Sequence, residues 1–595
     1  MGATVSLALV FATRTVAEED IEPRDAPAQP WAAGFAGIYG LRQSDPVLTG
    51  EGVKIGLLCR SLTYVDGEPQ NDYRPAIEHD CFAGKKINFN DRGDMPAGIS
   101  PHSTAICSIL LGEDANAFSH ELGGFCFQGI APGVELDVHE FWHFLINNVF
   151  GASAADADVI AASIGSRHED WWTRGMDAMV EHSGVIVVAG IGNGLNAHDP
   201  LLYPGAGANA IGVGVVSSVN TESAATNLEH FALAYPQDSS FGPTVDGRCK
   251  PDIVAPGNCL AAAADDPKLY EATGNWSSFS TPIVAGTVSL LLQKARQDSR
   301  LYDAVSPRPG NCVIKAILMN SAAKLPYWHK GGPGADDDHY SPLDYIQGAG
   351  MLNALGAYRQ LVAGPAKPNT GSTLPGTGWD NNILGPGENA KHVYTITVPA
   401  PADKFITVTA VWNRRYENQY PFDRTAEPDS DLRIELWAVD NNKPHGGYLL
   451  DYSDSAVDNV EHIWCRTDPN CTNYKIILSF GETEDEARGE KTQRYALAWN
   501  LSEAPREKNI FWYDLNADGI VDKLDFITLT SNWIISVTLP GSYFIGDINA
   551  NGVFDATDLE IFLNQRDRKA DWYVEDVPDE QNKNEYARNS RQSSS

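Results

Sequence analysis

The sequence predicts a modular protein whose largest part is an α/β domain, followed by a β-sandwich and a small helical domain. From about residue 50 to 362, short continuous apolar runs alternate with longer helical patterns, which is typical of a parallel sheet with helices on both faces. From about 380 to 503, β-branched and aromatic segments are separated by turn residues, which is typical of an antiparallel sandwich.

The expected elements follow from these two patterns. In the α/β domain the buried strands are expected at 53–58, 134–138, 159–162, 185–189 and 210–216, and an apolar helix at 287–293. In the sandwich, strands are expected at 393–398, 405–412, 432–438, 474–480 and 495–501.

We therefore divide the chain into seven parts. A signal peptide is expected at 1–17, although a wrongly assigned start codon explains its missing basic residues equally well. The others are an N-terminal segment at 18–45, the α/β domain at 46–362, a Gly- and Pro-rich linker at 363–379, the sandwich at 380–503, a helical domain at 508–567 and a charged, disordered tail at 571–595.

Composition excludes several classes of function. The net charge is −34, so nucleic acid and anionic membranes are not expected partners, and no apolar run is long enough for a membrane span. The nine cysteines contain no Cys-x-x-Cys pair, and most are expected to be buried small apolar side chains. Cys465 and Cys471 are close enough to clip a hairpin if the protein is exported.

Four segments suit acyl-transfer chemistry. Ser278 stands at the start of an apolar helix and is a candidate nucleophile, although an ordinary N-cap serine gives the same pattern. His102 also opens a helix and could act as its base, and the Asn193 amide could donate to an oxyanion. The small residues Ser163, Ile164 and Gly165 end a strand and could pair with an extended substrate.

In this order, the segments resemble the subtilisin-like serine peptidases over residues 46–362. The match includes Ser278-Phe279-Ser280-Thr281-Pro282, Tyr203-Pro204-Gly205 and the run from Phe241 to Gly257. The resemblance implies a subtilisin-like fold and an endopeptidase that acts on proteins or peptides through an acyl-enzyme. In that family Ser278 would be the nucleophile, His102 the base and Asn193 the oxyanion donor.

Position 59 departs from the family pattern, because Cys59 stands where the catalytic aspartate is expected. We expect Cys59 to face the nitrogen of His102 that does not face Ser278. Asp66 could fold back to replace the carboxylate, and Cys59 itself could be a nucleophile. Before the serine, Trp276 and Ser277 replace the family's Gly and Thr, and Trp276 should crowd the leaving-group side.

Two loops of calcium-binding type lie near the C-terminus. Their ligand positions carry oxygen donors or main-chain carbonyls, and a glycine makes the sharp turn at position 6. The first loop offers Asp514, Asn516, Asp518, Ile520, Asp522 and Asp525, and the second offers Asp547, Asn549, Asn551, Val553, Asp555 and Asp558. Asp-rich turns without metal are the alternative.

Because each loop ends in Asp and precedes one helix, residues 508–567 resemble a type I dockerin module. That resemblance implies about two Ca²⁺ ions and a cohesin-type protein partner, although the loops are further apart than usual. The whole sequence thus predicts a secreted serine endopeptidase, with impaired activity if Cys59 leaves His102 without a carboxylate. The alternative is a catalytically dead homologue that binds peptides or serves as a scaffold component, anchored through this module.

Overall fold

The computed structural model describes most of the chain between residues 30 and 569. The described ranges are 30–60, 63–65, 68–93, 97–119, 123–150, 156–217, 234, 236–306, 309–325, 328–331, 339–385, 390–398, 404–425, 431–440, 443, 446–468, 470–481, 492–503, 520–531, 556–564, 566–567 and 569. The expected signal peptide and tail, Asp66 and most of the calcium-loop ligands lie outside these ranges.

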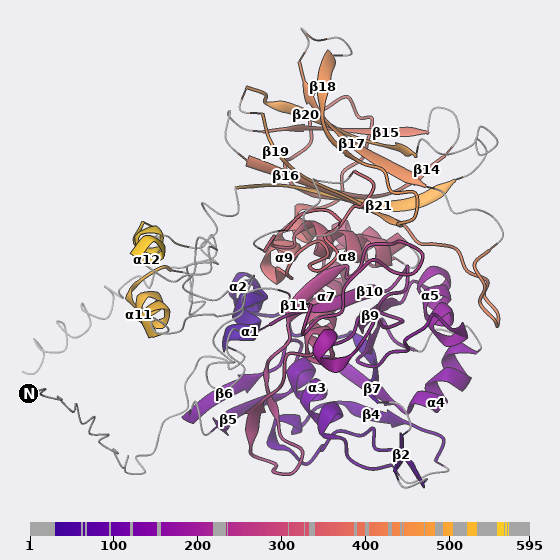
Figure 1. Ribbon diagram of the computed structural model, residues 1–595, viewed down its shortest axis with the longest axis vertical. Coiled ribbons are helices and arrows are strands. Elements are labelled where there is room, and N and C mark those ends of the chain that lie inside the picture. Colours follow the sequence, from indigo (N-terminus) through magenta and orange to yellow (C-terminus); the bar gives the residue numbers. More distant parts are fainter. Residues whose placement is uncertain are drawn as a thin grey trace, which may run out of the picture.

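A seven-stranded parallel sheet forms the centre of the first domain, which confirms the expected α/β fold (Figure 1). Its order is β11 (Ile253–Pro256), β10 (Ile211–Val216), β9 (Ile186–Gly190), β8 (Val159–Ala162), β1 (Lys54–Leu58), β7 (Glu135–His139) and β4 (Ile87–Asn90). All neighbouring pairs are parallel. The predicted bounds of β8 are confirmed, whereas β4 and β11 were not predicted.

Helices cover both faces of this sheet, because its strands are apolar on both sides. The longer ones are α3 (Pro101–Leu111), α5 (Trp171–Ser183), α7 (Ser277–Gln297), α8 (Pro309–Asn320) and α9 (Ala354–Ala363). The shorter elements are α1 (Pro30–Phe35), α2 (Ile38–Ser44), α4 (Phe141–Phe144) and three two-stranded ribbons, β2 (Thr63–Val65) with β3 (Glu68–Gln70), β5 (Glu113–Ser119) with β6 (Gly123–Gln128), and β12 (Leu260–Ala262) with β13 (Tyr270–Ala272).

Helix α7 is buried on nearly every side and contacts β8 to β11 and α3. A helix that is apolar all round has to lie inside a protein, which is why this one is central. A Cβ at Gly286 would lie 2.6 Å from the side chain of Ile130, so only glycine allows the close approach found here. The packing of α7 therefore fixes the place of Ser278 at its N-terminus.

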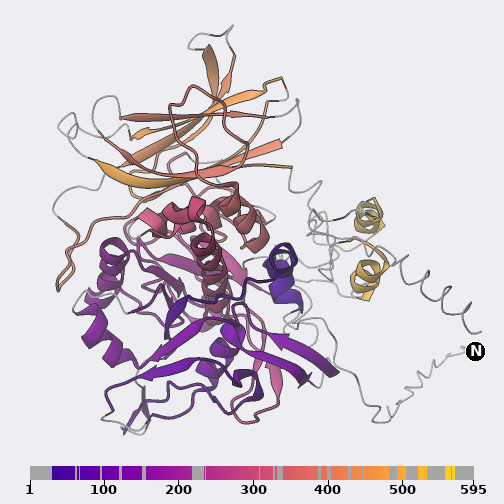
Figure 2. The ribbon, with the colours of Figure 1, turned by 180° about the vertical axis from the view of Figure 1, so that it is seen from behind.

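The second domain is a sandwich of two antiparallel four-stranded sheets, in agreement with the sequence pattern (Figure 2). One sheet has the order β14 (Gly378–Leu384), β21 (Gln493–Glu503), β16 (Lys404–Val411) and β19 (Val460–Arg466), and the other β15 (Lys391–Thr397), β20 (Asn473–Phe480), β17 (Leu432–Val439) and β18 (Gly447–Ser453). Trp412, Trp499 and Tyr394 fill the space between them. The expected clip is wrong, since both Cys465 and Cys471 are free thiols.

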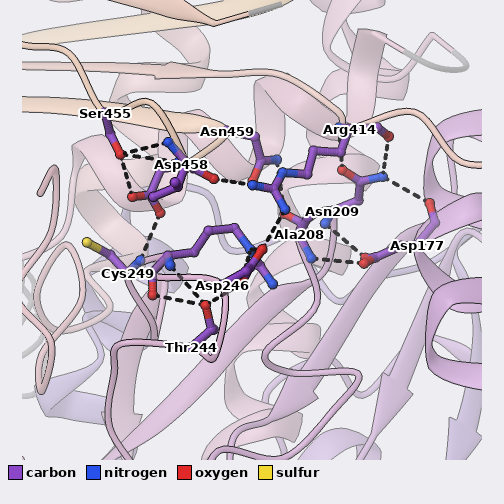
Figure 3. A network of polar contacts seen from close by, with 12 residues as sticks. Asp177, Ala208, Asn209, Thr244, Asp246, Cys249, Arg414, Ser455, Asp458 and Asn459 are labelled. Atoms are coloured by element: carbon purple, nitrogen blue, oxygen red, sulfur yellow. Dashed lines mark hydrogen bonds and ion pairs between the residues drawn. The ribbon is translucent and has the colours of Figure 1, made fainter. Parts of the chain in front are cut away.

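The sandwich packs on helices α8 and α9, so the two domains share one apolar core (Figure 1). Buried amides join them. Asn320 Nδ2 donates to Thr409 Oγ1 at 3.0 Å and to the Ala498 carbonyl at 3.1 Å. Asn459 Nδ2, from the sandwich, donates to the main-chain oxygens of Ala208 at 3.0 Å and of Trp412 (Figure 3).

The last two helices along the chain are α11 (Lys523–Ser531) and α12 (Ala556–Leu563). Phe526 and Phe562 lie 6.2 Å apart between ring centres, and the Asp567 N–H donates to the Val521 carbonyl at 2.8 Å. The two loop–helix units therefore contact each other. No helix of the described residues is both long enough and apolar enough to cross a membrane.

We predict that Asn459→Ala lowers the free energy of unfolding by about 1–3 kcal/mol, because the buried Trp412 carbonyl loses this donor and the Ala208 carbonyl keeps only the 3.4 Å contact to Lys315 Nζ. Denaturant titration of the full chain measures this loss. Asn470→Ala is the matched control, since this exposed amide bonds, among the residues that the structure describes, only to Asp468, and its effect should stay within about 0.5 kcal/mol. Equal effects of the two variants would contradict the anchoring role of Asn459.

Candidate active site

The sequence-predicted site residues meet at the carboxyl ends of three neighbouring strands. Cys59 follows β1, Ser163 follows β8 and Asn193 lies three residues after β9. His102 and Ser278 come from the first turns of α3 and α7. Open α/β sheets bind ligands at this edge, where loops rather than strands supply the side chains.

Ser278 is the second residue of α7 and is only 9% exposed. Its carbonyl accepts a 2.9 Å hydrogen bond from Ser163 Oγ, so the serine is tied to the end of β8. As part of the first helical turn, its N–H belongs to the amide groups that have no partner within the helix. Negative charge that develops beside Ser278 is favoured there, because the N-terminus of a helix carries partial positive charge.

His102 is held by the main chain of residue 59. Its Nδ1 lies 3.0 Å from the Cys59 carbonyl oxygen. A carbonyl can only accept, so Nδ1 carries the proton and Nε2 keeps its lone pair, which is the tautomer that a general base needs. Among the described residues, no hydrogen bond joins Ser278 Oγ to His102.

The Cys59 thiol does not take the place of the missing carboxylate. Sequence reasoning placed it against His102, but the thiol contacts the thiol of Cys107 in the core. Burial, and then this neighbour, raise the pKa of Cys107 far above its usual value. The expectation for position 59 is therefore wrong in one respect, because the main-chain oxygen and not the side chain faces the imidazole.

The pKa of His102 is lowered by burial and by the Arg60 charge. Partial burial lowers the pKa of His102 to about 4, the hydrogen bond to Cys59 raises it, and the Arg60 charge lowers it further. Arg60 Nε is itself buried without a hydrogen-bond partner among the described residues. His102 is thus neutral at pH 7, but the imidazolium that would form during catalysis is opposed by Arg60.

Asn193 is fixed by the start of α7. Its Oδ1 accepts from the Ser277 N–H at 2.8 Å and from Ser277 Oγ at 3.1 Å. Its Nδ2 lies 3.4 Å from Asp199 Oδ2, which uses one of the two amide hydrogens. The other hydrogen is the one that an oxyanion would need.

The segment Ser163, Ile164 and Gly165 leads away from Ser278 along the site. Ile164 packs on the core beneath, and Gly165 is exposed. A Cβ at Gly165 would lie 2.7 Å from Leu202 Cβ, and a Cβ at Gly192 would lie 3.2 Å from Leu202 Cγ. Leu202 thus fills the space between these two loops, which sequence reasoning did not foresee.

An aromatic pair completes the site. The His102 ring lies 5.8 Å from that of Phe279, and Phe279 stacks on Trp276 at 5.9 Å with 12° between the planes. Trp276 is 50% exposed, and crowding of the leaving-group side by its ring stays a prediction. The sequence shows Phe279 and Arg60 beside the motif residues, but nothing in their spacing indicates that they face His102.

Comparison with solved structures finds maturation proteases. The self-cleaved protease domain of PatA is 23% identical, covers 53% of this chain and 99% of that chain, and has a TM-score of 0.35. The prenylagaramide maturation protease PagA is 21% identical, covers 55% of this chain and 98% of that chain, and has the same TM-score.

Curated relatives match part of the chain. Pyrolysin of Pyrococcus furiosus is 26% identical over 284 residues, which are 42% of this chain and 18% of pyrolysin. C5a peptidase of Streptococcus pyogenes is 32% identical over 169 residues, which are 28% of this chain and 12% of that peptidase. The chain thus spans less than a fifth of the length of these relatives. The family model described as "Subtilase family" matches residues 50–350, about half of the chain, and the protein belongs to this family of serine peptidases.

Proposed function

We propose that the protein is a serine endopeptidase in which Ser278 is the nucleophile, His102 the general base and Asn193 an oxyanion donor. One observation supports this most directly. The 3.0 Å contact between His102 Nδ1 and the Cys59 carbonyl sets the tautomer and the ring orientation that the base requires. The orienting function of the missing aspartate is therefore supplied by the main chain.

The steps follow from these positions. His102 Nε2 takes the Ser278 hydroxyl proton while Oγ attacks a substrate carbonyl, and the tetrahedral oxyanion lies beside Asn193 Nδ2 and the first N–H groups of α7. His102 then protonates the leaving amine, and water hydrolyses the acyl-enzyme by the reverse sequence. Ser163, Ile164 and Gly165 hold the peptide in extended form.

Charge balance is the weak point of this site. In subtilisin, a member of the same family, loss of the aspartate alone costs about 3 × 10⁴ in kcat, a measured value for that enzyme and not one derived for this chain. That factor corresponds to roughly 6 kcal/mol of barrier. Here position 59 is a cysteine and the Arg60 charge lowers the pKa of His102, so we infer slow turnover.

The alternative function is peptide binding without cleavage. The Arg60 charge favours this alternative, because a positive charge that lowers the pKa of His102 opposes the imidazolium that acylation requires. A homologue of this kind would hold a peptide along Ser163–Gly165 and release it unchanged.

A fluorophosphonate probe distinguishes the two functions, since only an activated serine reacts readily with it. We expect slow covalent labelling of the full chain at Ser278, located by mass spectrometry, and none in Ser278→Ala. Absence of labelling in the native chain, or equal labelling of Ser278→Ala, would leave the peptide-binding alternative.

The pH dependence of labelling should follow His102. Its pKa in the folded protein is lowered to about 4, so the neutral base persists well below the ordinary titration range of histidine. The labelling rate should therefore stay level from pH 7 down to about 5 and fall to half near pH 4. A half-point near pH 6.5 would mean that His102 is neither buried nor close to Arg60 in solution.

We also propose that residues 508–567 bind about two Ca²⁺ ions and dock to a cohesin-type partner of a secreted assembly. Three expected ligands of the first loop, Ile520, Asp522 and Asp525, are described. Asp525 is fully buried at the start of α11, and its Oδ2 accepts from the Asp522 N–H at 2.7 Å. A buried carboxylate at the last ligand position suits a cation, which would neutralise the acidic loop and order it.

Calorimetric titration of the full chain with CaCl₂ should show about two sites, and Asp525→Ala should remove one of them. Asp265→Ala is the matched control, because this exposed carboxylate lies in the first domain and its loss should leave both sites. No heat of binding, with no change in circular dichroism on adding calcium, would exclude the proposed metal sites.

A further inference from the structure

A pocket of about 460 Å³ lies where the sandwich meets the first domain, and it is rich in arginine. Arg167 and Arg174 line it from the first domain, and Arg414 and Arg424 from the sandwich. Glu169 and Asp246 are the lining carboxylates. Four guanidinium groups against two carboxylates make this a locally cationic place in a chain whose net charge is −34.

A fifth arginine lies behind the wall of the pocket. Arg248 is 2% exposed, and its Nη1 is buried without a hydrogen-bond partner among the described residues. Its Nε donates to Asp246 at 2.9 Å. The same carboxylate accepts from Arg414 Nη1 at 2.9 Å; Figure 3 labels Arg414 and Asp246. The Asp246 carboxylate therefore accepts hydrogen bonds from two buried arginines.

Among the described residues, the remaining acidic groups cancel only part of this charge. Asp177, close behind, already accepts from the N–H groups of residues 208 to 210, and Asp423 lies 3.5 Å from Arg174. Glu169 has a raised pKa, mainly because it is partly buried and then because Asp177 is near. Positive charge that faces a cavity of this size attracts an anion, and guanidinium groups match carboxylates in two-point geometry.

The pocket adjoins the proposed peptide-binding edge. Arg167 is four residues beyond Ser163, whose Oγ is bonded to Ser278. Four residues span at most about 14 Å. Between them, Ser166 and Tyr203 pair through two 2.8 Å hydrogen bonds, and Tyr203 lines the pocket. A peptide laid along Ser163–Gly165 therefore reaches the arginines within about four residues.

We propose that this pocket is a subsite for an acidic side chain of the bound peptide, so that the protein selects Asp- or Glu-containing substrates. The inference rests on the proposed binding of peptides at Ser163–Gly165, but not on their cleavage.

Binding to the Ser278→Ala chain tests it without turnover. The probes are two fluorescent octapeptides, one with four central Glu residues and one with Gln in their place, and citrate is a free carboxylate competitor. At low salt the Glu peptide should bind at least about tenfold more tightly than the Gln peptide, and added salt should reduce this ratio. Arg167→Gln should bring the ratio close to one. This variant should fold, since the exposed Arg167 makes, within the described part of the chain, only a 3.5 Å contact to the His198 carbonyl.

Arg300→Gln is the control, because this substitution removes the same charge as Arg167→Gln. Arg300 is exposed and, among the described residues, pairs only with Asp298. The control variant should keep the preference for Glu. Equal affinity for the two peptides, no binding of either, or a preference that survives Arg167→Gln would overturn the inference. Tight citrate binding without any preference for the Glu peptide would do the same, by assigning the pocket to small anions. Labelling of Ser278 is measured separately, so failure here leaves the proposed catalysis standing, and failure of labelling leaves this subsite standing.

Discussion

The burial of helix α7 is the constraint on which the rest of the structure depends. This helix is buried on nearly every side between the parallel sheet and its other helices, where Gly286 lets it approach Ile130. Its position sets the first turn, and the first turn presents Ser278 at the carboxyl ends of β8 and β9. Asn193 and Ser163 then tie that turn to the two strands through hydrogen bonds with Ser277 and Ser278. The site is rigid because a core element carries it.

Within that frame, the loss of one side chain has separable consequences. A catalytic aspartate orients histidine and also balances the imidazolium. The orientation persists here, because the main-chain oxygen of Cys59 is the partner of Nδ1 and any residue at position 59 would supply it. Among the described residues no carboxylate balances the imidazolium, and the charge that shifts the pKa of His102 is that of Arg60. We therefore propose slow peptide cleavage at this site, in a protein that binds peptides selectively.

Some elements and site residues can be predicted from the sequence and others cannot. β8 was predicted to the residue because its run of apolar residues is continuous and bounded by polar ones, whereas β4 lies at the sheet edge, is half exposed and alternates with asparagine. Ser278, His102 and Asn193 stand in motifs, and the structure brings their segments to one edge. The role of the Cys59 carbonyl could not be predicted, because main-chain atoms are the same at every position. The arginine pocket joins residues some 250 positions apart, which only the docking of the sandwich brings together.

We propose that the main chain at position 59 orients His102 and that only charge balance is missing. The most direct measurement is the rate of fluorophosphonate labelling of Ser278 in Cys59→Ala and Cys59→Asp beside the native chain. The account predicts a rate within about threefold of native for Cys59→Ala, since the carbonyl remains. It predicts a rise for Cys59→Asp, with the factor of about 10⁴ measured for subtilisin as its upper bound. A hundredfold loss in Cys59→Ala, or an unchanged rate in Cys59→Asp, would contradict it.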